Sequence, residues 1–396
     1  SDASNVLNQA AEQYVKLGLE LGEYDKDYVD AYLGPDEWKK QAKAQLRSKQ
    51  QLASDISQLL QKLENLEVAK PDLKLRHKAL FRNVRAMDVR ARMLVGESFT
   101  FAEEARLIYD ANIPQYDFTK FDQALNEIDK LVPGEGDLAE RVDTFRSRFA
   151  IAEEKVSDVV NLAIAECKKR SDNYISLPNN ERFELEYVTG KSWSGYNWYQ
   201  GDNKSLMQIN QDFSMQIDRA IGLGCHEGYP GHHVWNVLIE NNLLSKNGWV
   251  EYSIFPLFSP YALIAEGSAN YGVDLAFPED QKVIFERDVL FPIAGLDPAT
   301  AETLEQLNKL TAQLSHAITA TAQLYLNAEI SREQAIEQRR KYSLVSQQRA
   351  EQSVRFIEQY RAYVLNYNLG KDIVSAYISK QSKDEAGKWQ AFERML

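Results

Sequence analysis

Apolar residues recur at spacings of three and four along most of the chain, as in VLNQAAEQYVKLGLEL at residues 6–21 and DISQLLQKLENL at residues 55–66. This spacing places apolar side chains on one face of an α-helix. Segments that contain Gly and Pro interrupt the pattern, among them LGPDEW at 33–38 and VPGEGD at 132–137, where helices are expected to end. The pattern predicts a mainly α-helical protein with roughly fifteen helices.

One region departs from the helical pattern. Residues 182–210, RFELEYVTGKSWSGYNWYQGDNKSLMQIN, alternate apolar and polar side chains around turns that contain Gly and Asn. A period of two is typical of β-strands. We expect two or three short strands in one small β-sheet near residues 182–212, lying against the histidine-rich segment that follows. The strand at 205–210 could pair with an extended peptide through its edge, with Asn210 contacting the peptide backbone, or the sheet could simply cover the helices.

The organisation of the chain is continuous, with no internal repeat, no low-complexity linker and no sharp change in composition. Such continuity favours one large helical domain over residues 1–396. We expect this domain to be loosely divisible into an N-terminal helical part, 1–175, and a part that carries the candidate chemistry, 176–396.

The segment GLGCHEGYPGHHVWN, residues 222–236, holds three of the five histidines of the chain. It begins like the H-E-x-x-H helix of zinc proteases, in which two histidines one turn apart bind zinc and the Glu is the general base. Pro230, however, occupies the position of the second histidine. On a straight helix His232 would point about 120° away from His226, and His233 would share its face but lie about 10.5 Å further along the axis.

A straight helix is not expected, because Pro230 lacks the N–H that a helix interior needs and a glycine lies close on each side of it. A local bulge across GYPG would absorb two residues and bring His232 to the place of the second ligand. The residues therefore predict a metal bound by His226 and His232, with His233 as the alternative to His232. Three core or capping histidines at a helix interruption are the structural alternative.

A third protein ligand is expected, since catalytic zinc commonly has three and keeps one position open. Glu266 lies among small residues in the apolar helical segment YALIAEGSANYGVDLAF, residues 261–277. A carboxylate that cannot reach solvent needs a partner, and a metal is one; an Arg pair or a helix cap is the alternative. Asp274, two turns later, could orient a histidine ligand by accepting its second N–H.

Two cysteines, Cys167 and Cys225, leave the compartment open, and the sequence does not indicate whether they meet. Because Cys225 precedes His226, it could be a thiolate ligand; a small buried thiol is the plainer interpretation.

The motif HEGYPGHH at 226–233, followed by AEGSA at 265–269, resembles the signature of a bacterial family, domain of unknown function 885, whose pattern is HExxPGHH and then EGWA. That family resembles gluzincin metallopeptidases such as the Taq-type carboxypeptidases, whose contracted motif is H-E-x-G-H. The resemblance covers roughly residues 180–380 and implies a zincin-like architecture with one zinc ion. The glycine before its second histidine ligand corresponds to Gly231, which favours His232. Ser268 replaces the family's Trp, and the P-G-Q before the late Tyr is absent.

Two further residues have expected catalytic roles. Glu227 would be the general base that acts on the water bound to zinc. Tyr367 corresponds to the family's late Tyr-x-x-Gly and would donate a hydrogen bond to the developing oxyanion. Arg219 and Arg355 could hold a substrate carboxylate, although structural roles are the plainer interpretation for both.

The sequence thus predicts a zinc-dependent metallohydrolase, a carboxypeptidase-like peptidase acting on peptide or amide bonds. The alternative is a catalytically silent helical protein that binds a peptide or an envelope component on a zincin scaffold. The formal net charge of -12 and the pI of about 5.1 argue against nucleic acid as a partner and favour a peptide or small-molecule substrate. No apolar run reaches the ~18 residues of a membrane span. A first residue other than Met is expected of a processed protein or lipoprotein of the bacterial envelope or periplasm; the cytoplasm is the alternative.

Overall fold

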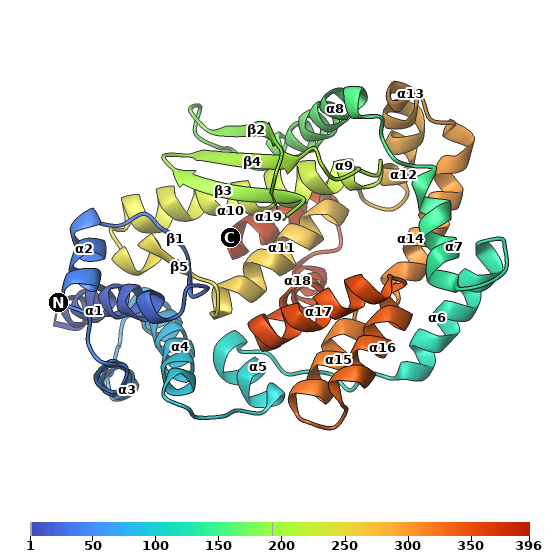
Figure 1. Cartoon of the computed structure of the whole chain (residues 1–396). Helices are drawn as coiled ribbons and strands as arrows, with labels where there is room; N and C mark the ends of the chain where they lie inside the picture. Colours follow the sequence, from blue (N-terminus) through green and yellow to red (C-terminus); the bar gives the residue numbers. More distant parts are fainter. Residues whose placement is uncertain (1, 192) are drawn as a thin grey trace. The chain divides into compact units, whose positions relative to one another are not determined.

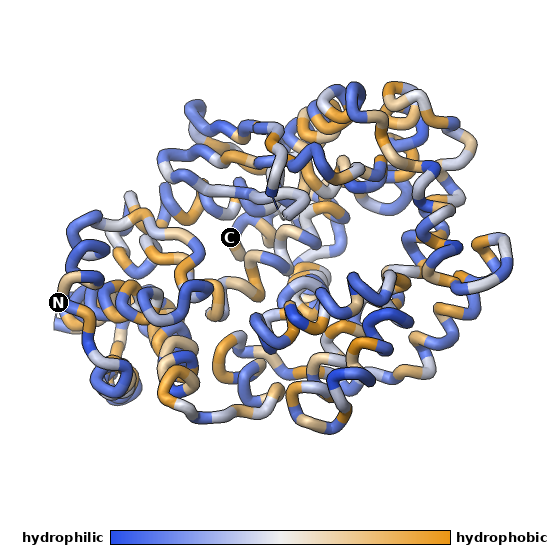
Figure 2. The backbone as a smooth tube through the Cα atoms, in the orientation of Figure 1, coloured by the Kyte–Doolittle hydropathy of each residue, from blue (hydrophilic) through white to orange (hydrophobic). Residues whose placement is uncertain are grey.

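The computed structural model describes residues 2–191 and 193–396. Of the residues that the structure describes, 68% are helical and 8% are in strands, so the predicted fold class is confirmed. The alternation of hydrophilic and hydrophobic residues that predicted the helices can be followed along the backbone in Figure 2. The chain divides into two compact units, residues 1–113 with 238–264, and residues 114–237 with 265–396. The boundaries between the units fall after residues 113, 237 and 264, and the looser division predicted near residue 175 stays a prediction.

The first unit combines long helices with a two-stranded sheet. Its elements are α1 (Asp2–Tyr24), β1 (Val29–Tyr32), α2 (Asp36–Ala44), α3 (Lys49–Glu64), α4 (Pro71–Leu94), α5 (Phe101–Tyr109), the π-helical turn η2 (Ile239–Lys246), the 3₁₀ turn η3 (Val250–Ser253) and β5 (Ile254–Pro256). Strands β1 and β5 pair antiparallel. They hold four and three residues, too few for a period of two to stand out in the sequence.

The core of the first unit follows from the amphipathic pattern. Helix α1 buries residues on one stripe, among them Leu7, Tyr14 and Leu21, as the spacing of its apolar residues predicts. A buried ion pair joins α4 to η3, with Nε of Arg76 2.8 Å from Oε2 of Glu251.

The second unit contains the predicted sheet and most of the remaining helices. Its elements are α6 (Phe118–Leu131), α7 (Leu138–Ser147), α8 (Glu153–Asp172), β2 (Arg182–Val188), β3 (Gly195–Gly201), β4 (Lys204–Asn210), α9 (Arg219–Gly222), the π-helical turn η1 (Leu223–Gly228), α10 (His232–Leu238), α11 (Pro260–Ala276), α12 (Gln281–Phe285), the π-helical turn η4 (Glu286–Leu290), α13 (Phe291–Ala294), the 3₁₀ turn η5 (Pro298–Thr300), α14 (Ala301–Ala312), α15 (Ala317–Leu326), α16 (Arg332–Ser343), α17 (Gln347–Tyr360), the 3₁₀ turn η6 (Arg361–Asn366), α18 (Asn368–Gln381) and α19 (Glu385–Met395). Residues 238–264 belong to the first unit, so the chain passes from the second unit to the first at the end of α10 and back to the second within α11.

The three-stranded sheet has the order β2-β4-β3, with β2 parallel and β3 antiparallel to β4 (Figure 1). The expectation that residues 205–210 offer a free edge is therefore wrong, because β4 is the central strand and both of its edges are already hydrogen-bonded. Asn210 does not face a peptide either: its Nδ2 donates to the carbonyl oxygens of Lys191 and Trp193, at 2.8 and 3.0 Å. The edge strands of this sheet are β2 and β3, and β3 contacts the histidine segment through Asn197, whose side chain donates a hydrogen bond to Glu227.

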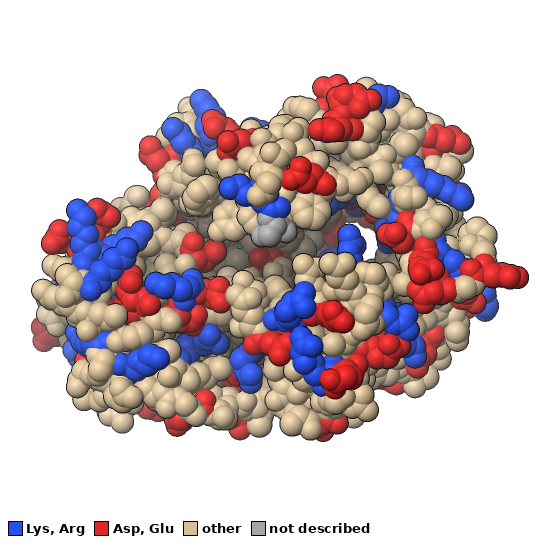
Figure 3. Space-filling model, viewed as in Figure 1, with Lys and Arg blue, Asp and Glu red and all other residues tan. Residues whose placement is uncertain are grey.

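The surface carries both kinds of charged side chain, as expected from 46 basic and 58 acidic residues in the sequence. Acidic and basic side chains are interspersed over the face shown in Figure 3. No helix among the described residues is both long enough and apolar enough to cross a membrane.

Candidate metal centre

The histidine segment departs from a regular helix where Pro230 predicted it would. The π-helical turn η1 carries His226 and ends at Gly228, and after the cis peptide bond between Tyr229 and Pro230 a new helix, α10, begins at His232. The structure thus has two separate helical segments, whereas the sequence predicted a bulge within one continuous helix. Hydrogen bonds close the interruption: the N–H of Tyr229 donates to the carbonyl of Gly224, and that of Gly231 to the carbonyl of Cys225, both at 2.9 Å.

Gly231 is required by the close approach of two backbone segments. A Cβ placed on this residue would lie 1.8 Å from the carbonyl oxygen of His226 and 2.5 Å from that of Cys225. No side chain fits at such distances. The absence of a side chain at Gly231 is therefore what allows His232 to return toward His226.

Three side chains converge on one point, from η1, α10 and α11. Nε2 of His232 lies 3.3 Å from Oε1 of Glu266, and Nε2 of His226 lies 3.5 Å from Oε2 of the same carboxylate. The two imidazole rings meet edge to face with their centroids 4.8 Å apart. One possible ligand atom from each residue lies within 4.8 Å of the others. The structure therefore brings together His226, His232 and Glu266.

The donor set fits a metal ion of the zinc type. Two imidazoles and one carboxylate are the protein ligands of many catalytic zinc sites, and ligands at 2.0–2.2 Å in a tetrahedron lie about 3.4 Å from one another. The distances from the two histidine nitrogens to the carboxylate oxygens of Glu266 match this spacing. Oε2 of Glu266 is buried and makes no hydrogen bond of normal geometry. Burial alone would raise the pKa of Glu266, but His232 and His226 beside it hold that pKa well below its ordinary range.

Glu227 lies beside the three ligands. Its Oε1 is 3.7 Å from Nε2 of His226, and its Oε2 accepts a hydrogen bond of 2.7 Å from Nδ2 of Asn197 on β3. The same Nδ2 donates to the backbone carbonyl of Glu227 at 3.2 Å. Sequence reasoning missed Asn197. Its inward position in the alternating strand next to the motif was the only signal that could have suggested it.

His233 belongs to a separate buried network. Its Nε2 donates to Oε2 of Glu181 at 2.7 Å, its Nδ1 is hydrogen-bonded to Oγ of Ser205 at 2.7 Å, and the hydroxyl of Tyr229 donates to the same Glu181 oxygen at 2.6 Å. The side chain of His233 is fully buried. Both of its ring nitrogens are engaged, so His233 is not the alternative ligand. Its hydrogen bond to Ser205 on β4 connects the start of α10 to the sheet, and the hydrogen bond from Asn197 on β3 to Glu227 connects η1 to the same sheet.

The carboxylate of Glu181 is the centre of this network. Burial alone would raise its pKa, but the hydrogen bonds from His233 and Tyr229, with the ammonium of Lys168 3.6 Å away, lower that pKa overall. The group is therefore held as a carboxylate, which accepts both hydrogen bonds.

Tyr367 directly precedes α18 and lies close enough to Glu266 and Glu227 for their charges to act on its phenol. Burial raises the pKa of its phenol, and the negative charges of Glu266 and Glu227 raise it further. Its hydroxyl therefore stays protonated and able to donate. Two glycines allow α18 to come this close, since a Cβ on Gly267 would lie 2.4 Å from the backbone of Gly370.

The remaining candidates lie elsewhere. Asp274 does not orient a histidine; its carboxylate is exposed and pairs with Lys371 at 2.8 Å. Arg219 lies on α9 with its Nη1 donating to Oγ of Ser194 at 3.3 Å, and Arg355 is exposed on α17.

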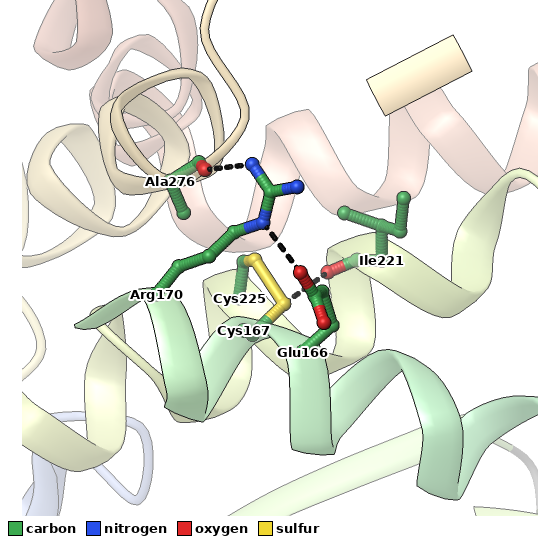
Figure 4. The surroundings of a disulfide bond; sticks show 6 residues. All are labelled: Glu166, Cys167, Arg170, Ile221, Cys225 and Ala276. Atoms are coloured by element: carbon green, nitrogen blue, oxygen red, sulfur yellow. Dashed lines mark hydrogen bonds and ion pairs between the residues drawn. A yellow bond between two sulfur atoms is a disulfide. The ribbon is translucent and has the colours of Figure 1, made fainter. Parts of the chain in front are cut away.

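A disulfide joins Cys225 to Cys167 on α8 (Figure 4), so Cys225 is neither a thiolate ligand nor a free thiol. Arg170, one turn after Cys167, donates to the carboxylate of Glu166 and to the carbonyl of Ala276 at the end of α11. Helix α8 thus contacts both segments that carry ligands. The sequence offered no signal for this pairing, because 58 positions separate the two cysteines.

Comparison with known proteins finds similarity of fold. A solved structure of a candidate lipoprotein from Colwellia psychrerythraea matches with a TM-score of 0.55 and 15% sequence identity, over 95% of this chain and 74% of that chain. At this identity the likeness shows a shared fold alone. No protein-family model matches the chain, and no curated protein does.

Proposed function

We propose that the protein is a zinc-dependent metallohydrolase that cleaves peptide or amide bonds, with His226, His232 and Glu266 as the ligands of one ion. The observation that carries the proposal is the presence of Glu227 beside these ligands. A purely structural or storage site needs no such second carboxylate, whereas hydrolysis needs a general base.

The roles of the residues follow from their positions. Zinc bound at the three ligands would polarise the scissile carbonyl and lower the pKa of a water molecule. Glu227, held by Asn197, takes a proton from the attacking water and delivers it to the leaving amine. Tyr367, kept protonated by burial and by the two carboxylates, donates a hydrogen bond to the oxygen on which negative charge develops.

We also propose that the protein works in an oxidising compartment of the bacterial envelope. The disulfide between Cys167 and Cys225 supports this location, because disulfides persist where thiols are not kept reduced. The lipoprotein description of the structural neighbour points the same way.

The test combines metal content with turnover. Zinc should bind at one ion per chain, and the protein should hydrolyse members of a mixed peptide library. Glu227→Gln keeps the size of the side chain but removes its basicity, so zinc content should remain while turnover falls about a hundredfold or more. Glu184→Gln, an exposed position on β2, is the matched control and should change neither.

Two results would contradict the proposal. A Glu227→Gln variant as active as the unmodified protein would remove Glu227 as the base. A zinc-loaded protein that cleaves no peptide, amide or ester would instead be a catalytically silent binding protein.

A further inference from the structure

A cavity of about 670 Å³ in the second unit is separate from the candidate metal centre, because none of the three metal ligands lines it, and neither Glu227 nor Tyr367 does. Arginines from three helices line this cavity: Arg146 on α7, Arg219 on α9 and Arg349 on α17. Small-molecule sites commonly measure about 300 to 1,000 Å³. The cavity therefore has the size of such a site, and the charges around it decide which ligand it fits.

The charges of the lining are not balanced. Arg219 donates to a serine hydroxyl at 3.3 Å, and the guanidinium of Arg349 makes no hydrogen bond; neither has a carboxylate partner within the described residues. Arg146, in contrast, is paired with Asp218 at 3.4 Å. The other acidic residue of the lining, Asp143, is exposed to solvent. Three guanidiniums thus face two carboxylates, one of which is already paired.

A fourth guanidinium, that of Arg339 on α16, lies directly behind the wall of the cavity. Its Nη2 donates to Oγ of Ser343, which lines the cavity, and its Nε donates to Oγ of Ser353 at 3.0 Å. Arg339 is only 7% exposed, its Nη1 is buried without a hydrogen-bond partner, and no carboxylate in the described part of the chain pairs with it. Burial lowers the pKa of this guanidinium to about 10, so it stays charged at neutral pH. A buried charge is costly unless it is paired, so this cation favours an anion nearby.

The hydroxyl of Ser343 connects the buried cation to the cavity. Because its oxygen accepts from Arg339, its own O–H remains free to donate to a ligand, and a donor polarised by a cation is a stronger one. Phe213, Leu344 and Val345 add apolar surface to the same lining. The cavity therefore fits a ligand that has an anionic group and an apolar organic group.

We propose that this cavity binds a small organic phosphate monoester. Arg219, Arg349 and Ser343 hold the phosphate. Phe213 and Val345 contact the organic group. A phosphate monoester carries about -1.5 to -2 charges at pH 7 and three acceptor oxygens, which suits two guanidiniums without carboxylate partners, whereas a single carboxylate would neutralise only one of them. The planar fork of arginine also matches phosphate oxygens in a bidentate arrangement.

The experiment titrates three probes into the full chain by calorimetry after a chelator has removed metal, because a bound zinc ion is a second place for phosphate to bind. Phenyl phosphate should bind at one molecule per chain. Benzoate, which carries a single charge, should bind at least about tenfold more weakly. Inorganic phosphate, which lacks the organic group, should also bind at least about tenfold more weakly.

Variants of the arginines locate the site. Arg219→Gln and Arg349→Gln should each lower the affinity for phenyl phosphate by about 10- to 100-fold, the range expected for a hydrogen bond to a charged group. Arg355→Gln is the matched control and should bind like the unmodified protein, since Arg355 is an exposed arginine on the same helix as Arg349 and does not line the cavity. Arg339→Met should weaken binding without lowering the urea midpoint of the unliganded protein, because it replaces a buried cation that has no counter-charge.

Three results would each overturn the inference: no binding of phenyl phosphate in the low millimolar range, equal affinity for phenyl phosphate and benzoate, or an affinity that Arg219→Gln and Arg349→Gln both leave unchanged. These two exposed variants decide the matter even where Arg339→Met does not fold. The titration requires no turnover, so its failure leaves the proposed hydrolysis standing, and a protein without hydrolase activity would still bind the phosphate.

Discussion

Replacing Gly231 by alanine should abolish the metal centre without touching a ligand. The added Cβ would lie 1.8 Å from the carbonyl oxygen of His226, whereas ordinary contacts begin at 3.4 Å. One of the two backbone segments must therefore move by about 1.6 Å, given that packed interiors do not tolerate overlap. These segments carry His226 and His232, and a metal site tolerates displacements of only about 0.2 Å in its ligand distances.

Two quantities should change together in Gly231→Ala. The affinity for zinc should fall by more than about a hundredfold, since one ligand is lost from the set. The free energy of unfolding of the metal-free protein should fall by about 3 kcal/mol, the upper range for an overpacked interior. Gly222→Ala in the same helical segment is the matched control, because a Cβ there meets nothing within 4 Å. It should keep the affinity for zinc and gain about 0.5 to 1 kcal/mol of stability, as alanine favours the helix.

Competition with a chromophoric chelator measures the affinity for zinc, and urea unfolding followed by circular dichroism measures the stability. A Gly231→Ala variant that binds zinc within threefold of the unmodified protein and unfolds at the same urea concentration would refute the reasoning. The close approach of Gly231 to His226 would then not be what positions His232.

Three further predictions concern the hydroxyl, the buried network and the disulfide. Tyr367→Phe should lower kcat about a hundredfold with zinc content and KM unchanged, and equal kcat values in steady-state kinetics would exclude the hydroxyl from the reaction. Glu181→Gln should lower the free energy of unfolding by about 3 kcal/mol at pH 7, against less than about 0.5 kcal/mol for the exposed Glu184→Gln. Because folding lowers the pKa of Glu181, its carboxylate stabilises the fold above the unfolded pKa of about 4.3, and this stabilisation is lost as the pH falls below that value. A difference in the free energy of unfolding between Glu181→Gln and the unmodified protein that stays constant from pH 7 to pH 3 in urea unfolding would contradict this. The disulfide closes a loop across 58 positions, and its reduction should lower the free energy of unfolding by about 4 kcal/mol. The Cys167→Ala, Cys225→Ala double variant has no disulfide, so the reductant should not change its free energy of unfolding.

The sequence by itself determined those features that depend on neighbouring residues. Helices follow from apolar spacings of three and four, and the sheet at 182–210 follows from a period of two, because each pattern decides which faces of a local element can be buried. Pro230 indicated an interrupted helix, since proline cannot donate the missing hydrogen bond. Glu266 stood out as a carboxylate among small residues. These signals were enough to select His226 and Glu266 and to limit the second histidine to His232 or His233.

Tertiary structure alone decided the features that depend on distances between remote segments. Whether His232 or His233 faces the ligands depends on the path of the chain around Gly231, and His233 turns away because Glu181 and Ser205 occupy both of its ring nitrogens. The pairing of the two cysteines likewise depends on where α8 packs. Strand order is set by hydrogen bonds between strands, which leave no trace in the period of a single strand. The position of β4 at the centre and the contact of Asn197 on β3 with Glu227 could therefore be seen only in the folded chain.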